Sequence, residues 1–230
     1  MPHRPRLLDL FCCAGGATRG YQLAGFHVVG VDIEPQPDYC GDEFIQDDAL
    51  EFPLDGFDAI HASPPCQSFT AYRRKGHGVG DGYPDLIKPV RARLEQSGVP
   101  WVIENVAGAP LRNAVMLCGS SFGLDVRRHR YFESNVLGLY GTHCLHQRQG
   151  RPVGVYGDHP QDDSDYRRPD GTRRGQKART ITEAQTALGI DWMTTWDDLA
   201  DAIPPAYTEH IGRQLIEHIE RGADPEGLTA

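Results

Sequence analysis

Residues 6–32 read RLLDLFCCAGGATRGYQLAGFHVVGVD and predict a strand, a tight turn of small residues, a helix and a second strand. The helix should end at Gly25, and the second strand ends in the carboxylate of Asp32. A glycine turn followed by an acid about 20 residues later is typical of nucleotide-binding βαβ units, although any tight strand-to-helix turn can hold glycines. The stretch therefore predicts an α/β fold with a Rossmann-like sheet and leaves cofactor binding open.

A further short strand is predicted at residues 57–63, and it leads directly into Pro64, Pro65 and Cys66. In an open α/β sheet, functional residues collect where strands end. Two successive prolines fix two φ angles, so the backbone should set the position of the thiol. A single cysteine is more often a small buried apolar residue. Cys66 becomes a candidate nucleophile because of the polar residues that end the later strands.

The next predicted strand, residues 99–106, carries Glu104 and Asn105 to the same end of the sheet as Cys66. A carboxylate there could belong to a structural ion pair. Burial would also raise its pKa and let it act as a proton donor.

Residues 126–132 predict a further strand, on which Arg128 and Arg130 alternate and so share one face. For Arg127, a side chain exposed to solvent remains the simplest interpretation. Two arginines on one face beside aromatic residues fit contacts to an anion or a base edge better.

Two segments carry clustered positive charge. The first follows Cys66 and combines three consecutive cations with alternating glycines, which favours a loop that closes over a substrate. The second lies within residues 133–178, where hydrophobic periodicity fades. Both could equally be solvated surface loops. The candidates for contacts to phosphates are Arg73, Arg74, Lys75, Arg167, Arg168, Arg173, Arg174 and Lys177.

Composition narrows the class of protein. The chain has 230 residues with 39% hydrophobic and 24% charged residues, which suits one globular domain with a small insertion. A net charge of −9 argues weakly against a general nucleic-acid-coating protein. No long apolar run or signal peptide is present, so we expect no membrane contact and a cytoplasmic location. The six cysteines form no C-x-x-C pair, which predicts reduced thiols.

A metal site is not predicted. His143, Cys144 and His146 lie close together, but no second pair of ligands stands at a typical zinc spacing.

We expect a catalytic domain made of residues 1–132 plus 179–221, a small insertion at 133–178, and a frayed tail at 222–230. The region after residue 179 predicts a helix with Thr182 as its N-cap, and the region after Pro204 predicts a long amphipathic helix.

Taken together, these motifs resemble the DNA cytosine-5 methyltransferases. The ordered combination of Pro-Pro-Cys-Gln with Glu-Asn-Val is specific in a way that no single motif is. The similarity covers roughly residues 6–132 and 179–213, and three departures occur: Cys13 replaces a glycine, Val126 replaces a glutamine, and Ala202-Ile203-Pro204-Pro205 lacks the family's Gly-Asn. The matching segments are residues 9–16, 64–67, 104–106, 128–130, 179–189 and 203–212.

The resemblance implies transfer of a methyl group from S-adenosylmethionine to C5 of a cytosine flipped out of double-stranded DNA. It implies that Cys66 attacks C6, that Glu104 holds N3, and that Arg128 and Arg130 assist. We expect a monomer, with an accessory specificity partner as an option because the insertion is short, in a restriction-modification or phage DNA-modification setting. The implied cofactor residues are Phe11, Ala14, Gly15, Gly16, Asp32, Ile33, Asp48 and Pro65, and Gln67 joins the candidates for nucleic-acid contact.

Other functions stay open. The same catalytic domain could act on tRNA, and a non-catalytic nucleic-acid-binding module is a second alternative, although such a module should have lost Cys66, Glu104 or Arg130. Methylation of an exocyclic amine is disfavoured because those enzymes use an Asn/Asp-Pro-Pro-aromatic motif without a cysteine. Methylation of a free nucleotide is a minor alternative.

Overall fold

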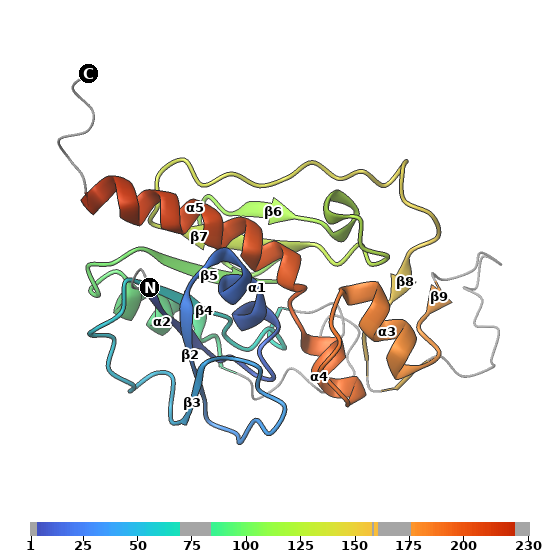
Figure 1. Cartoon of the computed structure of the whole chain (residues 1–230), viewed down its shortest axis with the longest axis horizontal. Helices are drawn as coiled ribbons and strands as arrows, with labels where there is room; N and C mark the ends of the chain where they lie inside the picture. The colour runs from blue at the N-terminus through green and yellow to red at the C-terminus, as the bar shows by residue number, and fades with distance from the viewer. Residues whose placement is uncertain (1–3, 70–83, 158, 161–175, 224–230) are drawn as a thin grey trace.

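The computed structural model describes residues 4–69, 84–157, 159–160 and 176–223. Their main feature is a seven-stranded sheet with helices on both faces (Figure 1). Its strands follow the order β3-β2-β1-β4-β5-β7-β6. The bounds are β1 Arg6–Leu10, β2 His27–Asp32, β3 Glu43–Gln46, β4 Ala59–Ala62, β5 Trp101–Asn105, β6 Val115–Leu117 and β7 Arg130–Ser134.

The strand directions decide where the polar residues meet. Strands β1 to β5 pair in parallel, whereas β7 runs antiparallel to both β5 and β6. The carboxyl ends of β1, β2, β4 and β5 therefore lie along one edge. Because β7 is antiparallel, its first residue, Arg130, lies at that same edge, and Asn105 pairs with Tyr131.

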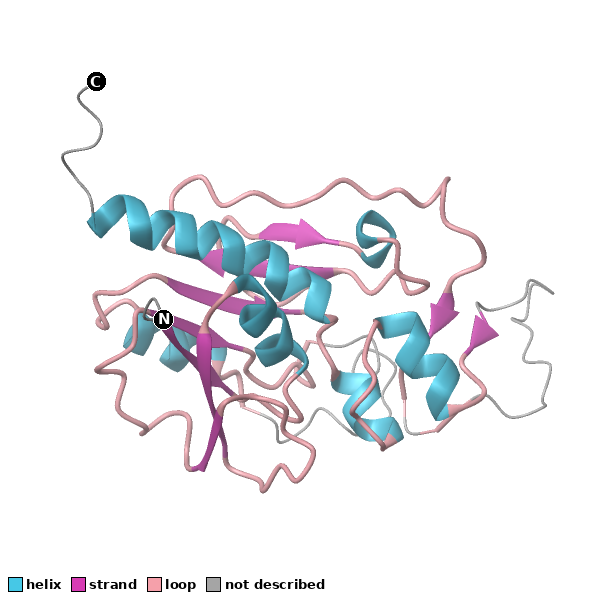
Figure 2. Ribbon diagram, viewed as in Figure 1, coloured by secondary structure: helices cyan, strands magenta, loops and turns pink. Residues whose placement is uncertain are grey.

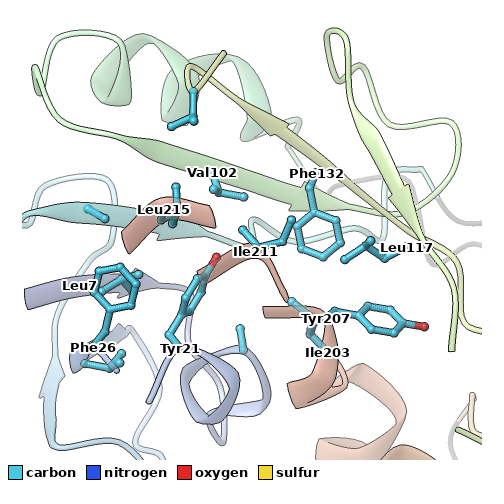
Figure 3. Close-up of a cluster of buried hydrophobic side chains, with 14 residues drawn as sticks. Leu7, Tyr21, Phe26, Val102, Leu117, Phe132, Ile203, Tyr207, Ile211 and Leu215 are labelled. Carbon is cyan, nitrogen blue, oxygen red and sulfur yellow. The ribbon is translucent and has the colours of Figure 1, made fainter. Parts of the chain in front are cut away.

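Helices cover both faces of this sheet. Helix α1 (Gly16–Ala24) and helix α5 (Pro205–Ala223) pack on one face, and α2 (Ile87–Leu94) packs on the other. Along β1, Leu7 belongs to the first core cluster, whereas Leu8 and Leu10 belong to the second. Both faces are buried, which is why the parallel strands read as nearly continuous apolar runs. Figure 3 shows the first cluster, with Tyr21 of α1 beside Ile211 and Leu215 of α5.

Glycines allow α1 and the start of α5 to approach closely. A Cβ placed on Gly20 would lie 2.1 Å from the carbonyl oxygen of Pro205. A Cβ on Gly16 would lie 2.6 Å from the carbonyl oxygen of Ile203. The segment before α5 therefore lies directly against the turn that follows β1.

A smaller group of elements adjoins the sheet, and Figure 2 shows its two helices and its strand pair beside one another. It contains α3 (Ile181–Leu188), α4 (Trp196–Asp201) and the parallel pair β8 (Val153–Gly154) and β9 (Gln176–Lys177). Its core includes Leu188, Met193, Trp196 and Leu199, with Val155 from the predicted insertion. The insertion thus contributes to a shared core.

The predicted N-cap at Thr182 is wrong. Thr180 caps α3, because its side chain accepts a hydrogen bond from the backbone N–H of Glu183. The carboxylate of Glu183 accepts from the N–H of Arg179, the residue before the cap, at 2.7 Å, so the side chains of Thr180 and Glu183 both accept from backbone N–H groups at the start of α3.

The predicted domain division stays a prediction, but two elements cross its boundaries: β7 runs through residues 130–134, and α5 extends to Ala223. Within the described ranges, no helix has the length and apolarity that a membrane crossing requires.

Candidate active site

The turn after β1 adopts an unusual backbone conformation. Phe11, Cys13 and Gly15 have φ angles of 61°, 45° and 86°, all in the left-handed region that favours glycine. The N–H of Cys13 donates to Oδ2 of Asp32 at 3.0 Å. Cys13 therefore adopts a left-handed conformation that glycine takes more readily than cysteine. At the two non-glycine residues, Phe11 and Cys13, such a conformation costs of order 1–3 kcal/mol each; strain of this kind persists where surrounding contacts enforce it and is frequent at ligand sites.

The end of β2 and the segments that follow β2 and β3 supply three more of the predicted cofactor residues, and Pro65 follows β4. Asp32 is buried, and its second oxygen accepts from the N–H of Glu34 at 3.1 Å. Ile33 follows it with 64% of its surface exposed. Asp48 lies after β3, where its carboxylate accepts from the N–H of Leu50 at 2.8 Å. A fixed carboxylate beside an exposed apolar side chain suits a ribose joined to a flat base.

The segment that carries Cys66 is held by the end of β5. The side-chain amide of Asn105 donates to the carbonyl oxygen of Pro64 at 2.9 Å. Cys66 itself is half-buried, and its carbonyl accepts from the N–H of Phe69 at 2.8 Å. Burial raises the pKa of the thiol, the charge of Arg130 lowers it, and the carboxylates of Glu104 and Asp201 raise it further. The thiol therefore needs a positive neighbour or a base to ionise.

Glu104 and Arg130 form an ion pair next to this thiol. Nε of Arg130 lies 2.9 Å from Oε1 of Glu104, and both side chains are largely buried. The contact is poorly aligned as a hydrogen bond, and Oε1 accepts none from the described residues. Burial raises the pKa of Glu104 to about 7, although the charges of Arg130 and Arg128 and the Ser63 hydroxyl oppose the shift. Glu104 can therefore hold or release a proton near neutral pH.

A buried chain of polar side chains leads to Glu104, and its inner members were not predicted. The hydroxyl of Tyr21 lies 2.9 Å from Nδ1 of His61, and Nε2 of His61 lies 2.7 Å from Oγ of Ser63. Burial lowers the pKa of His61 to about 3, so the imidazole is neutral. When Glu104 is ionised, Ser63 must donate to it, and His61 must then donate to Ser63 and accept from Tyr21. The only sequence signal was a histidine inside an apolar strand.

The predicted alternation of Arg128 and Arg130 on a strand is wrong. Arg128 has a φ of 27° and precedes β7, so the two residues do not share a strand face. Its guanidinium donates to the carbonyl of Ala200 at 2.8 Å and also to the carbonyls of Val155 and Ala202. Burial and the charge of Arg130 lower the pKa of Arg128 to about 9. Arg128 therefore fastens α4 and the residue after β8 to the sheet, whereas Arg130 faces Glu104.

Residues from the C-terminal part of the chain also reach the site. Nε1 of Trp192 donates to the carbonyl of Ala14 at 2.9 Å. The negative charge of Asp201, the last residue of α4, acts to raise the pKa of both Cys66 and Arg128. Neither residue was predicted, because contacts over such sequence separations leave no local pattern.

A cavity of about 330 Å³ opens beside Arg130. Cys66 and Glu104 are not part of its wall. Its lining joins the arginine segment to the predicted insertion and consists of Val126, Arg127, Arg128, Arg130, Pro152, Val153, Gly154, Val155, Tyr156 and Ala200.

Of the predicted nucleic-acid contacts, two lie in the described residues. Gln67 is half-buried in the turn next to Cys66. Lys177 lies over the rings of Tyr156 and Trp196, with Nζ 5.1 and 5.3 Å from their centroids. The remaining candidates, Arg73, Arg74, Lys75, Arg167, Arg168, Arg173 and Arg174, lie outside the described residues.

The expectation of no metal site stays a prediction. Two further residues with side chains that can ligate a metal, Cys118 and His129, lie beside Cys144 and His146.

The solved structures that resemble this chain share its fold. No family model matches the sequence, and no curated protein matches it. Among solved structures, a proposed DNA modification methyltransferase encoded within an E. coli prophage is similar, with 14% identity and a TM-score of 0.61. S. pombe Dnmt2 methyltransferase has 15% identity and a TM-score of 0.60, and Entamoeba histolytica methyltransferase EhMeth has 11% and 0.58. Each alignment covers 94% of this chain and 99% of the other.

The strand order, the antiparallel β7 and these similarities agree with one another. The predicted fold class is confirmed: the chain has a Rossmann-like α/β fold similar to that of these methyltransferase structures.

Proposed function

We propose that the protein methylates C5 of cytosine in double-stranded DNA, with S-adenosylmethionine as methyl donor and a covalent adduct between Cys66 and C6 of the base. The observation that supports the proposal most directly is that Cys66, the buried Glu104 and Arg130 lie at one edge of the sheet, with Nε of Arg130 2.9 Å from Oε1 of Glu104. These groups match the needs of a base that must be attacked and protonated at different atoms.

The residues around the β1 turn fit S-adenosylmethionine. The turn is held in a strained conformation, Asp32 is fixed by backbone N–H groups, and Ile33 is exposed beside it. We assign the ribose hydroxyls to Asp32 and the adenine to Ile33 and Asp48. The methionine part then lies near Pro65 and along Phe11 and residues 14–16. S-adenosylmethionine supplies an electrophilic methyl group on a cationic sulfur.

The reaction asks three things of the protein. The Cys66 thiolate donates an electron pair to C6 of cytosine, and Glu104 supplies a proton or a hydrogen bond at N3, so that electron density moves to C5. C5 would then take the methyl group as the bond between this methyl and the sulfur of the donor breaks, and the N3 proton would return to Glu104. A base such as water would remove the C5 proton, and the C6–sulfur bond would break to release the Cys66 thiolate. Arg130 lowers the pKa of the Cys66 thiol and pairs with Glu104, and it can also bind the base oxygen. The target base must leave the helix stack to reach these groups.

A tritium-transfer assay tests this function and its RNA alternative. Wild-type protein with labelled S-adenosylmethionine should label duplex DNA and leave tRNA unlabelled. Labelling of tRNA alone would favour the RNA alternative, and labelling of neither substrate would contradict both.

Trapping with DNA that contains 5-fluorocytosine tests the covalent step. The wild type should form a stable complex and Cys66→Ala should not, because fluorine cannot leave as the C5 proton does. The variant keeps the other five cysteines, which controls for unspecific thiol reactivity. A trapped complex with Cys66→Ala would assign the nucleophile elsewhere.

A further inference from the structure

We propose that Cys118, His129, Cys144 and His146 bind one zinc ion. Their ligand atoms, one from each side chain, all lie within 4.8 Å of one another. They come from three separate segments: Cys118 follows β6, His129 precedes β7, and Cys144 and His146 belong to the loop after β7. Two thiolates and two imidazoles form a donor set typical of structural zinc sites.

The distances suit a tetrahedral ion. Sγ of Cys118 lies 3.2 Å from Nε2 of His146, and Sγ of Cys144 lies 3.3 Å from Nε2 of His129. In a zinc tetrahedron, bond lengths of about 2.1 Å to nitrogen and about 2.3 Å to sulfur place the ligands about 3.4 to 3.8 Å apart. These two contacts would lengthen by a few tenths of an ångström around an ion, and the widest separation in the cluster, at most 4.8 Å, would shorten by up to about 1 Å.

The backbone around the cluster is held by contacts that do not involve the four ligand side chains. Ser120 accepts from the N–H of Leu145 at 2.9 Å, and Ser121 donates to the carbonyl of His143 at 2.7 Å. The N–H of Thr142 donates to the carbonyl of Met116 at 3.2 Å. The loop that carries Cys144 is thus fixed beside β6 by the fold itself, which lowers the entropic cost of gathering four ligands.

Ser120 also serves the proposed ligand Cys118 directly. Its Oγ lies 3.1 Å from the sulfur, so the hydroxyl can donate to a thiolate there. Hydrogen bonds of this kind orient metal ligands and stabilise their charge. Cys118 is fully buried, and a buried thiolate without a cation nearby would be costly.

The ion would have a structural role, because protein side chains fill all four of its coordination positions. His129 stands between Arg128 and Arg130 in the sequence, so an ion held there would fix the backbone that presents both arginines. It would also tie the loop after β7 to the end of β6. The predicted result is a protein whose stability depends on zinc, whether or not it methylates cytosine.

Metal analysis of the purified chain is the first test. Wild-type protein, prepared without a metal-affinity tag or chelator, should contain about one zinc ion per chain, measured by inductively coupled plasma mass spectrometry. Cys144→Ser and His146→Ala should each lose most of it. His143→Ala is the matched control, since its side chain is an exposed neighbour of Cys144 outside the cluster, and it should keep the metal.

Reconstitution of the wild type gives a second test that depends on no variant. Chelator-treated protein should take up one equivalent of zinc and gain thermal stability, as expected when an ion binds only the folded state. With cobalt it should show the visible absorption of a tetrahedral thiolate complex, and Cys144→Ser should not. Wild-type protein that retains no metal after zinc addition and gel filtration would overturn the proposal, as would full binding by Cys144→Ser. A non-reduced mass that reveals a Cys118–Cys144 disulfide would also overturn it.

Discussion

The side-chain amide of Asn105 donates a 2.9 Å hydrogen bond to the carbonyl of Pro64, so the last residue of β5 holds the segment that presents Cys66. Asn105 is buried, and its Oδ1 accepts from the N–H of Val106 at 2.9 Å. The strand that supplies Glu104 therefore also positions the candidate nucleophile. The side chain of Asn105 therefore contributes to the relative placement of thiol and carboxyl, together with the pairing of β4 with β5.

Asn105→Ala should slow trapping of 5-fluorocytosine DNA and destabilise the protein by about 1 to 3 kcal/mol, because the Pro64 carbonyl loses its buried donor. Trapping rates and urea unfolding measure the two effects. Asn135→Ala is the matched control: this asparagine bonds the backbone of Val99 and Trp101 at the other end of β5. It should lose stability but keep the trapping rate. Equal trapping rates in both variants would remove the positioning role.

Glu104→Gln should remove a pH dependence of stability. The pKa of Glu104 is raised from 4.5 to about 7, so the folded chain binds a proton that the unfolded chain releases between these values. Its stabilising contribution is complete below pH about 4.5 and is lost as the pH rises through about 7. The unfolding free energy of the wild type, relative to the variant, should fall by up to the order of 3 kcal/mol across this window. A difference that stays constant with pH would contradict the raised pKa.

Ser63→Ala should shift that window upward. The Ser63 hydroxyl lowers the pKa of Glu104, so its removal should raise that pKa above about 7. Unfolding free energies measured across pH, against the same variant with Glu104→Gln added, isolate the shift. Ser97→Ala is a suitable control, because its hydroxyl bonds the Leu94 carbonyl at the end of α2 and should leave the window in place. If the pH window of Ser63→Ala is unshifted, the Tyr21–His61–Ser63 chain does not influence the pKa of Glu104.

Asp32→Ala should weaken S-adenosylmethionine binding by about 1 to 3 kcal/mol, through loss of charge-assisted hydrogen bonds to the ribose and of the bond to the Cys13 N–H. Calorimetric titration measures the change. Asp58→Ala provides the control, since its carboxylate accepts from the N–H of Arg6 at the first residue of β1, away from the turn. If Asp32→Ala binds S-adenosylmethionine with unchanged affinity, the ribose does not bind at Asp32.

The sequence by itself determined the elements whose cause is local. The strand, turn and helix of residues 6–25 follow from apolar runs and glycines, and the helix ends at Gly25 as predicted. The convergence of Cys66 and Glu104 also followed from sequence, because parallel strands place their carboxyl ends on one edge. Arg130 reaches that edge for another reason, because β7 is antiparallel and begins there.

Only the tertiary structure decided the features that depend on distant contacts. Arg128 leaves the predicted strand with a positive φ because its guanidinium bonds carbonyls of α4 and of Val155. Trp192 reaches Ala14, and Cys118 reaches His146, across separations that no periodicity records. A pattern along the chain reports which face of an element is buried. It does not report which residue of another element lies opposite, because packing of the whole chain sets that partner.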